Sequence, residues 1–124
     1  MNTFKKSERL CDRKSTENLF LKGRSLVEEP FRWVYLEVDE ERESCVKTQI
    51  VVPKRNVIKA VNRNLIKRHI KEAFRNNKSH LINNLEKKKI KINLSIIYQS
   101  NNIISSVVIE EKIKSSLIRL NSNL

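Results

Sequence analysis

The sequence predicts an α+β fold, a compact α/β sandwich in which helices pack on one central sheet of about four strands. Three observations lead to this prediction. Residues 62–75 repeat apolar side chains every four positions, as the buried face of a helix does. Residues 31–38 are rich in strand-forming side chains, and residues 90–98 alternate apolar with polar ones. The 124 residues contain no internal repeat, so we expect one domain over residues 1–124.

The N-terminal region is basic and poor in apolar side chains, which predicts an extended arm over residues 1–14. A short helix is expected over residues 15–22, with Ser15 or Asp12 as its cap. Two residues, Leu19 and Phe20, are expected on its buried side. Gly23 is the only glycine of the chain, and we expect it to end this helix in the left-handed conformation.

Two strands are expected next, over residues 31–38 and 46–52, the second of which is stopped by Pro53. The acidic stretch 39–44 between them has the composition of a hairpin loop, so the two strands are expected to pair antiparallel. Residues 54–59 form a basic connector that has room for a further short strand.

The C-terminal half is expected to begin with a long helix over residues 60–76 and a short one over residues 79–86, which Ser79 would cap. A half-buried strand over residues 90–98 and a helix from about Ser106 to Leu120 complete the chain. The buried stripe of that last helix would comprise Ile109, Ile113, Leu117 and Leu120. The predicted order is helix, two strands, a possible short strand, long helix, short helix, strand and helix.

The charge of the chain is large and unevenly placed. The formal net charge is +12, and residues 54–78 hold nine basic residues and one acid, a net charge of +8. On the long helix Ile66, Ile70 and Phe74 form a core stripe, and a basic stripe of Arg63, Lys67, Lys71 and Arg75 recurs with the same spacing. Like charges at this spacing repel one another on an isolated helix, so a polyanion outside the protein is the simplest compensation.

Residue types that would carry protein-based catalysis are not gathered in a recognisable motif. The acids at positions 39–43 lie in an expected loop without an apolar framework, so we interpret them as solvated charge rather than as ligands of catalytic metal ions. His69 and His80 have no evident partner, although His69 lies beside the basic stripe, where it either touches RNA or stays half-exposed. Cys11 and Cys45 lack metal-ligand spacing and are expected to be reduced thiols of a cytoplasmic protein. Neither a signal peptide nor a membrane span is expected.

Residues 52–75 resemble a stretch of the bacterial ribonuclease P protein component. The resemblance rests on Val52-Pro53-Lys54-Arg55-Asn56, on Arg63-Asn64-Leu65 and on the Ile66-Lys67-Arg68 continuation. It extends to Arg9-Leu10, to Phe20 and Gly23, and to the aromatic first strand. Leu65 departs from the family pattern, which has a basic residue at this position.

This resemblance implies a left-handed β-α-β crossover around the long helix, against the usual right-handed rule. It also implies that the protein assists an RNA subunit, which removes the 5′ leader of precursor tRNA with bound Mg²⁺. The Mg²⁺ would be held mainly by that RNA and the substrate, with no organic cofactor and no catalytic or metal-binding residue in the protein. The residues expected to contact the RNA subunit are Lys54, Arg55, Asn56, Arg63, Asn64, Lys67, Arg68 and Lys71. Those expected near the leader are Phe20, Lys22, Arg24, Arg32, Trp33, Tyr35 and Lys47.

Two alternatives remain open at this point. A structural RNA-binding protein of the ribosome would share a basic helix on a small sheet. A DNA-binding helix module agrees less well with the sequence, because no helix-turn-helix pair accompanies the basic stripe and base-reading side chains are few, so DNA is not an expected partner. The aromatic side chains of residues 31–35 also have two interpretations, since such a stripe serves either core packing or base stacking.

Overall fold

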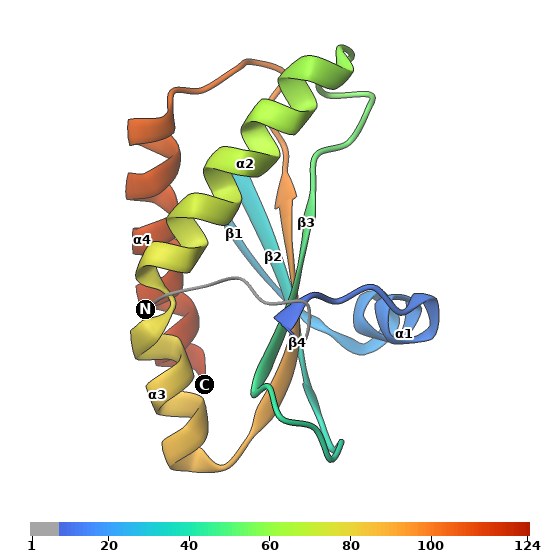
Figure 1. Cartoon of the computed structure of the whole chain (residues 1–124), viewed down its shortest axis with the longest axis vertical. Helices are drawn as coiled ribbons and strands as arrows, with labels where there is room; N and C mark the ends of the chain where they lie inside the picture. The colour runs from blue at the N-terminus through green and yellow to red at the C-terminus, as the bar shows by residue number, and fades with distance from the viewer. Residues whose placement is uncertain (1–7) are drawn as a thin grey trace.

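Residues 8–124 fold into four helices and a four-stranded mixed sheet (Figure 1), which confirms the predicted α+β class. The structure is a computed structural model that describes residues 8–124. The elements are α1 (Arg13–Lys22), β1 (Arg24–Glu28), β2 (Phe31–Val38), β3 (Val46–Val51), α2 (Ala60–Asn77), α3 (Ser79–Lys88), β4 (Lys91–Tyr98) and α4 (Ser106–Asn123).

The N-terminal prediction is partly wrong. Asp12 is the cap of α1 and accepts a hydrogen bond from the Ser15 amide at 2.8 Å, so the helix already begins at Arg13. The part of the predicted arm at residues 1–7 lies outside the described residues. Just before α1, Arg9 forms a parallel bridge with Thr48 of β3.

The strand order is β1-β2-β4-β3, which corrects the predicted pairing. β2 pairs antiparallel with β1 and with β4, and β3 pairs parallel with β4. Strands β2 and β3 are therefore not neighbours, and residues 39–45 are not a hairpin loop but cross from one side of β4 to the other. β4 takes the central place because its side chains are buried on both sides of the sheet from Ile92 to Ile96. The sequence analysis predicts a half-buried strand here, and this is wrong because β4 is buried on both faces of the sheet.

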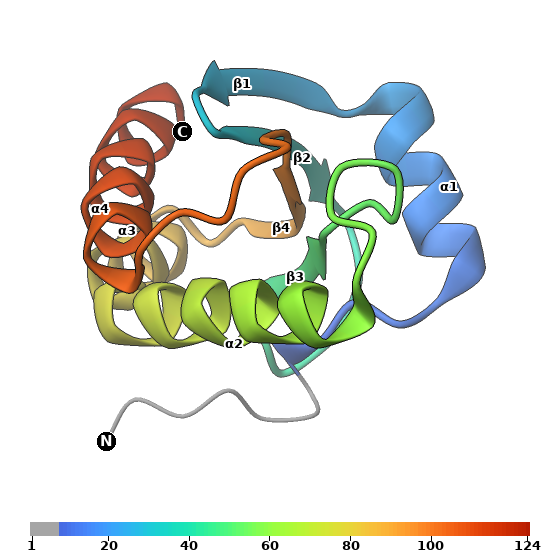
Figure 2. The ribbon, with the colours of Figure 1, turned by 90° about the horizontal axis from the view of Figure 1, so that it is seen from above.

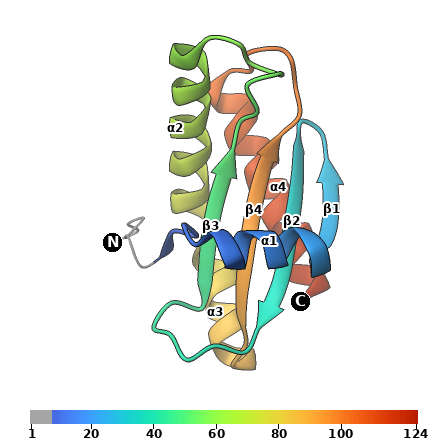
Figure 3. The same ribbon diagram turned by 90° about the vertical axis from the view of Figure 1, so that its right-hand side faces the viewer.

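The path from β3 through α2 and α3 into β4 is a left-handed crossover. In Figure 3 the two parallel strands point upward, β4 lies to the right of β3, and α2 lies behind the sheet. This confirms the handedness that the family resemblance implies.

Helices cover the two faces of the sheet unequally. α2, α3 and α4 pack on one face, and α1 crosses the other (Figures 1 and 2). The apolar stripes predicted for α2 and α4 are buried in the larger core, and each fully buried aliphatic side chain contributes about 1.5–3 kcal/mol. A smaller core under α1 comprises Leu10, Leu19 and Val34, with Leu36 and Ile97 packed against it.

Gly23 does not adopt the left-handed conformation. Its φ is −72° and its ψ is 158°, which any residue adopts. Glycine is needed because the chain passes so closely there: a Cβ atom would lie 2.3 Å from the Leu19 carbonyl oxygen and 2.9 Å from Cγ1 of Val34. The left-handed residue is instead Lys89, which ends α3.

β1 is a strand that the sequence analysis did not predict. It carries one buried residue, Leu26, and so lacks a visible alternation. Its last residue, Glu28, binds α4 across the edge of the larger core, where its carboxylate accepts hydrogen bonds from the Ser115 and Ser116 hydroxyls at 2.7 Å and 3.0 Å. Burial alone would raise the pKa of Glu28, but these bonds and the Arg119 charge at 3.5 Å lower it below its ordinary value.

The turns around α3 differ in detail from the prediction. Lys78, not Ser79, occupies the cap position, and its helical backbone lets α2 run almost directly into α3. The Lys78 side chain is buried and forms an ion pair with Glu8. No strand forms in residues 54–59, where a turn leads into α2 instead.

Candidate nucleic-acid interface

One flank of α2 and the connector before it present a group of basic side chains. We call this surface the α2 basic face; it comprises Lys54, Arg55, Arg63, Lys67, Arg68 and Lys71. All are exposed except Arg63, which is half-buried. Arg63, Lys67 and Lys71 follow one another at four-residue spacing on one side of the helix, and the opposite flank faces α4. The sequence thus predicts this face correctly as a surface, whereas contact with RNA remains a prediction.

Two of the residues predicted to bind RNA also hold the connector in place. The Arg63 guanidinium donates hydrogen bonds to the carbonyl oxygens of Val57 at 3.0 Å and Ile58 at 2.6 Å. The Asn56 side-chain amide donates to the Tyr98 carbonyl at 3.0 Å. Both side chains bind backbone carbonyls of the protein itself. They therefore stabilise the connector whether or not a partner is bound.

Leu65, which departs from the family pattern, does not lie on the basic flank. Helical spacing places it with His69 and Asn76 on the flank toward α4, and Asn76 lines a groove there together with side chains of α4. Leu65 and His69 are both half-buried. The exposed Asn64 and Arg68 lie between the two flanks. The lack of a basic residue at Leu65 therefore does not change the α2 basic face.

The face of the sheet that α1 crosses holds part of the predicted leader site. Arg32 and Lys47 alternate onto this face with Val34 and Leu36, which form the smaller core under α1. Phe20 is predicted to be buried, but 45% of its surface is exposed, and it lies on α1 next to the buried Leu19. The register adds two apolar residues that sequence reasoning missed: Val27 lies opposite Arg32 on β1, and Ile97 lies opposite it on β4. Only the pairing of the strands reveals them.

Trp33 and Tyr35 point to the other face of the sheet and so do not share a surface with Arg32 and Lys47. Trp33 is fully buried and Tyr35 is 7% exposed, and both belong to the larger core beneath α2, α3 and α4. The burial of Trp33 leaves no ring face for a base, whereas Tyr35 lines a hollow at the edge of this core. Lys22 and Arg24 lie apart from Arg32 and Lys47, because they line a separate hollow of about 370 Å³ next to the C-terminal Leu124.

One arginine holds the loop between β2 and β3 against β4. Arg42 donates to the Asn93 side-chain oxygen at 2.7 Å and to the Ile92 carbonyl at 2.6 Å, and it pairs with Glu40 at 3.2 Å. These contacts fix the loop across the end of β4. Within residues 8–124, no group of three or more His, Cys, Asp or Glu side chains is arranged to hold a metal ion.

The two cysteines differ in exposure. Cys11 is exposed and Cys45 is half-buried, and both are free thiols. Burial, followed by the charge of Glu86, raises the pKa of the Cys45 thiol above its ordinary value.

In the part of the chain that the structure describes, no helix has both the length and the apolar character that crossing a membrane requires.

Comparisons with known proteins agree with this architecture. A family model described as Ribonuclease P matches residues 4–120. The chain is 33% identical over 120 residues to the ribonuclease P protein component of Porphyromonas gingivalis, which covers 96% of this chain and 87% of that protein. It is 39% identical over 77 residues to the corresponding protein of Petrotoga mobilis, 62% of each chain.

Solved structures show the same fold. The RNase P protein from Thermotoga maritima superposes with a TM-score of 0.71 at 25% identity, covering 90% of this chain and 96% of that one. A mutant Staphylococcus aureus RNase P protein superposes with a TM-score of 0.73 at 21% identity, covering 94% and 90%. The matches in sequence and the shared fold lead to one conclusion: the chain belongs to the family of ribonuclease P protein components, which work with an RNA subunit in tRNA processing.

Proposed function

We propose that this protein binds the RNA subunit of ribonuclease P through the α2 basic face and assists removal of the 5′ leader from precursor tRNA. The observation that carries the proposal is the α2 basic face itself, on which five exposed cationic side chains lie with one half-buried arginine. Phosphate groups of a folded RNA satisfy such a surface, and the rigid helix fixes their register.

The face of the sheet crossed by α1 is proposed to receive the leader. Phe20, Val27 and Ile97 offer apolar surface there, and Arg32 and Lys47 offer positive charge. An exposed aromatic ring stacks on any base, and cations contact any phosphate, so this surface tolerates different leader sequences. Such tolerance is what a factor that processes many precursors requires. Trp33 and Tyr35 take no part in it.

The chemistry is proposed to reside in the RNA subunit. Hydrolysis of the phosphodiester bond would use Mg²⁺ held by that RNA and by the substrate. The protein side chains described above neutralise phosphate charge and orient the two RNA molecules relative to each other. They do not supply a nucleophile or a general base.

Reconstitution tests the proposal. The protein, candidate ribonuclease P RNA and a leader-bearing precursor are combined with and without each component at low Mg²⁺. We expect 5′ maturation only when both protein and RNA subunit are present. Cleavage by the protein alone, or sedimentation of the chain with ribosomal particles instead of the RNA subunit, would refute the assignment.

A matched pair of variants on α1 tests the leader surface. Phe20→Ala removes the exposed ring, whereas Leu21→Ala removes a side chain that is 82% exposed. Loss of one stacked base corresponds to about 1–3 kcal/mol, so Phe20→Ala should weaken binding of leader-bearing precursor about fivefold or more and leave binding of leaderless tRNA unchanged. Leu21→Ala should change neither. Equal losses for both ligands, or an equal loss in Leu21→Ala, would mean that the Phe20 ring does not stack on a base of the leader.

A further inference from the structure

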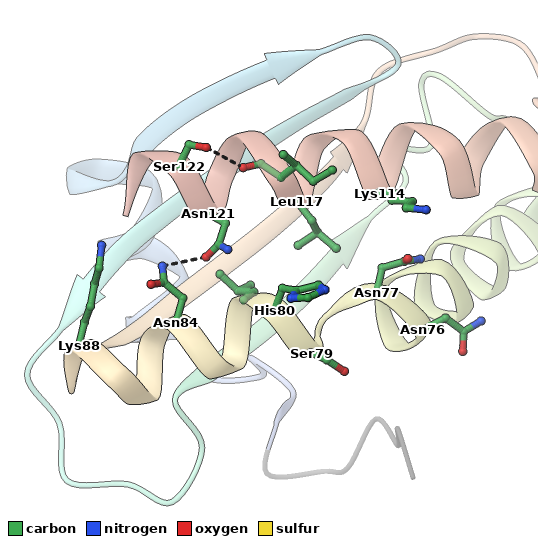
Figure 4. A pocket seen from close by; sticks show the side chains of 12 residues that line it. Asn76, Asn77, Ser79, His80, Asn84, Lys88, Lys114, Leu117, Asn121 and Ser122 are labelled. Atoms are coloured by element: carbon green, nitrogen blue, oxygen red, sulfur yellow. Dashed lines mark hydrogen bonds between the residues drawn. The ribbon is translucent and has the colours of Figure 1, made fainter.

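A groove between α3 and α4 lies outside both surfaces described so far. Its volume is about 750 Å³, and it runs from the end of α2 along α3 and the second half of α4 (Figure 4). Its lining residues are Asn76, Asn77, Ser79, His80, Leu81, Asn84, Lys88, Lys114, Leu117, Ile118, Asn121 and Ser122. The groove is on the flank of α2 that faces α4, and so away from the α2 basic face.

The chemistry of the groove is that of neutral hydrogen-bonding groups above an apolar floor. Among the described residues, four asparagine side chains line it and no Asp or Glu does. Asn84 donates one amide hydrogen to the Asn121 side-chain oxygen at 2.8 Å (Figure 4). This bond holds the two amides side by side and leaves the other Asn84 hydrogen and both Asn121 hydrogens for a ligand. Leu117 and Ile118 provide apolar surface beside these amides, and Ile118 is exposed.

Two lysines mark opposite ends of the groove. Lys114 on α4 and Lys88 on α3 are both exposed and are well separated in Figure 4. Lys88 donates to the carbonyl oxygen of Leu124, at the end of α4. The distance along α4 from Lys114 to Leu124 is about 15 Å at 1.5 Å per residue, which exceeds the size of a single small anion.

We propose that the α3–α4 groove binds a short single-stranded segment of RNA. Lys114 and Lys88 contact phosphates at the two ends, and the Asn84–Asn121 pair donates hydrogen bonds to base edges between them. Ile118 contacts the flat apolar surface of a base or ribose. The segment belongs to the RNA subunit or to another RNA chain, and the site is independent of the proposed contacts of the α2 basic face.

An acidic peptide is the other polyanion that two lysines attract. The amide pair alone does not separate the two ligands, because a peptide backbone also has a carbonyl acceptor at every residue. The apolar floor of Leu117 and Ile118 favours RNA. Bases supply acceptor edges between phosphates, and they also have an apolar surface for the floor of the groove. The two ligands therefore differ in whether a flat ring lies between their charges and covers the apolar floor.

The test is a titration of the isotope-labelled full chain with a short single-stranded oligouridine, followed by nuclear magnetic resonance. We expect the side-chain amide signals of Asn84 and Asn121 to shift at saturation. Lys114→Glu should weaken this binding about tenfold and lower its salt slope by about 0.7. Lys112→Glu, an equal charge change at an exposed position of α4 outside the groove, should leave it unchanged.

Further arms separate this site from the α2 basic face and from simple charge attraction. Lys67→Glu should weaken binding of ribonuclease P RNA and leave the shifts of Asn84 and Asn121 with oligouridine intact, so failure of one proposal is distinguishable from failure of the other. Thermal unfolding checks each variant, and Lys114→Gln replaces Lys114→Glu if the latter is destabilised. Absence of shifts in the groove of the wild-type chain would overturn the inference. Displacement of oligouridine by polyglutamate at equal charge concentration would overturn it as well, in favour of an acidic peptide.

Discussion

Lys67 and Arg63 lie on the same flank of α2, yet the structure predicts different consequences when each is replaced by alanine. Lys67 is exposed, and its removal changes only the charge of the α2 basic face. Arg63 is half-buried and donates to two backbone carbonyls of the connector. Its removal therefore acts on the fold as well as on the interface.

The magnitudes follow from these contacts. One exposed phosphate contact is worth about 1 kcal/mol, so Lys67→Ala should weaken binding of ribonuclease P RNA about fivefold without a change in the free energy of unfolding. Arg63→Ala should weaken binding at least as much. It should also lower the free energy of unfolding by about 1–3 kcal/mol, because the Val57 and Ile58 carbonyls lose a charged donor.

Filter binding over a series of salt concentrations measures both effects, and denaturant unfolding measures stability. For each lost phosphate contact the slope of log affinity against log salt should fall by about 0.7–0.9. Lys112→Ala, on α4 away from the α2 basic face, is the charge-matched control and should leave the slope unchanged.

The result that would refute this reasoning is specific. If Lys67→Ala leaves the salt slope unchanged, Lys67 does not contact phosphate, whatever happens to the affinity. If Arg63→Ala is as stable as the wild type, the two hydrogen bonds to the connector do not stabilise the fold.

Three other predictions concern the fold. Gly23→Ala should destabilise the protein by about 1–3 kcal/mol in denaturant unfolding, since its Cβ would lie 2.3 Å from the Leu19 carbonyl oxygen and α1 would have to shift; an unaltered midpoint would contradict the close approach. Glu28 has a pKa below its ordinary value of 4.5, so its contribution to stability should be complete above that pH and be lost as the pH falls through the lowered pKa. Glu28→Gln should thus be less stable at neutral pH and less sensitive to acid, and equal acid unfolding curves would exclude this role. Cys45 should react with iodoacetamide at pH 8 much more slowly than the exposed Cys11, because burial raises the pKa of its thiol; equal labelling rates by mass spectrometry would contradict this placement.

The helices were predictable from the sequence because their signals are local. A four-residue apolar spacing located α2 and α4 and identified the buried stripe of α4 residue by residue. The pairing of strands depends on residues far apart in the chain, and no local pattern states which strand takes the centre. The acidic stretch 39–44 resembles a hairpin loop in composition, but Arg42 fastens it to Asn93 and Ile92 as it crosses β4.

The same contrast between local and long-range signals applies to the candidate site. The α2 basic face was predictable because one helix carries most of it. The aromatic stripe of β2 was ambiguous because both faces of the sheet are covered, so alternation alone did not tell core from surface. The strand register resolves this ambiguity: Arg32 shares its face with α1, and Trp33 lies in the larger core.

The position of Leu65 connects these observations to function. A basic residue in its place would project from the flank of α2 that faces α4, where Asn76 already lines the α3–α4 groove. The residue present there, Leu65, is half-buried and uncharged. Positive charge is present in the groove that Asn76 lines, at Lys114 of α4 and Lys88 of α3. If the α3–α4 groove binds RNA, the contact that this chain lacks at Leu65 is replaced by one in the groove that begins at Asn76, about three helical turns further along α2.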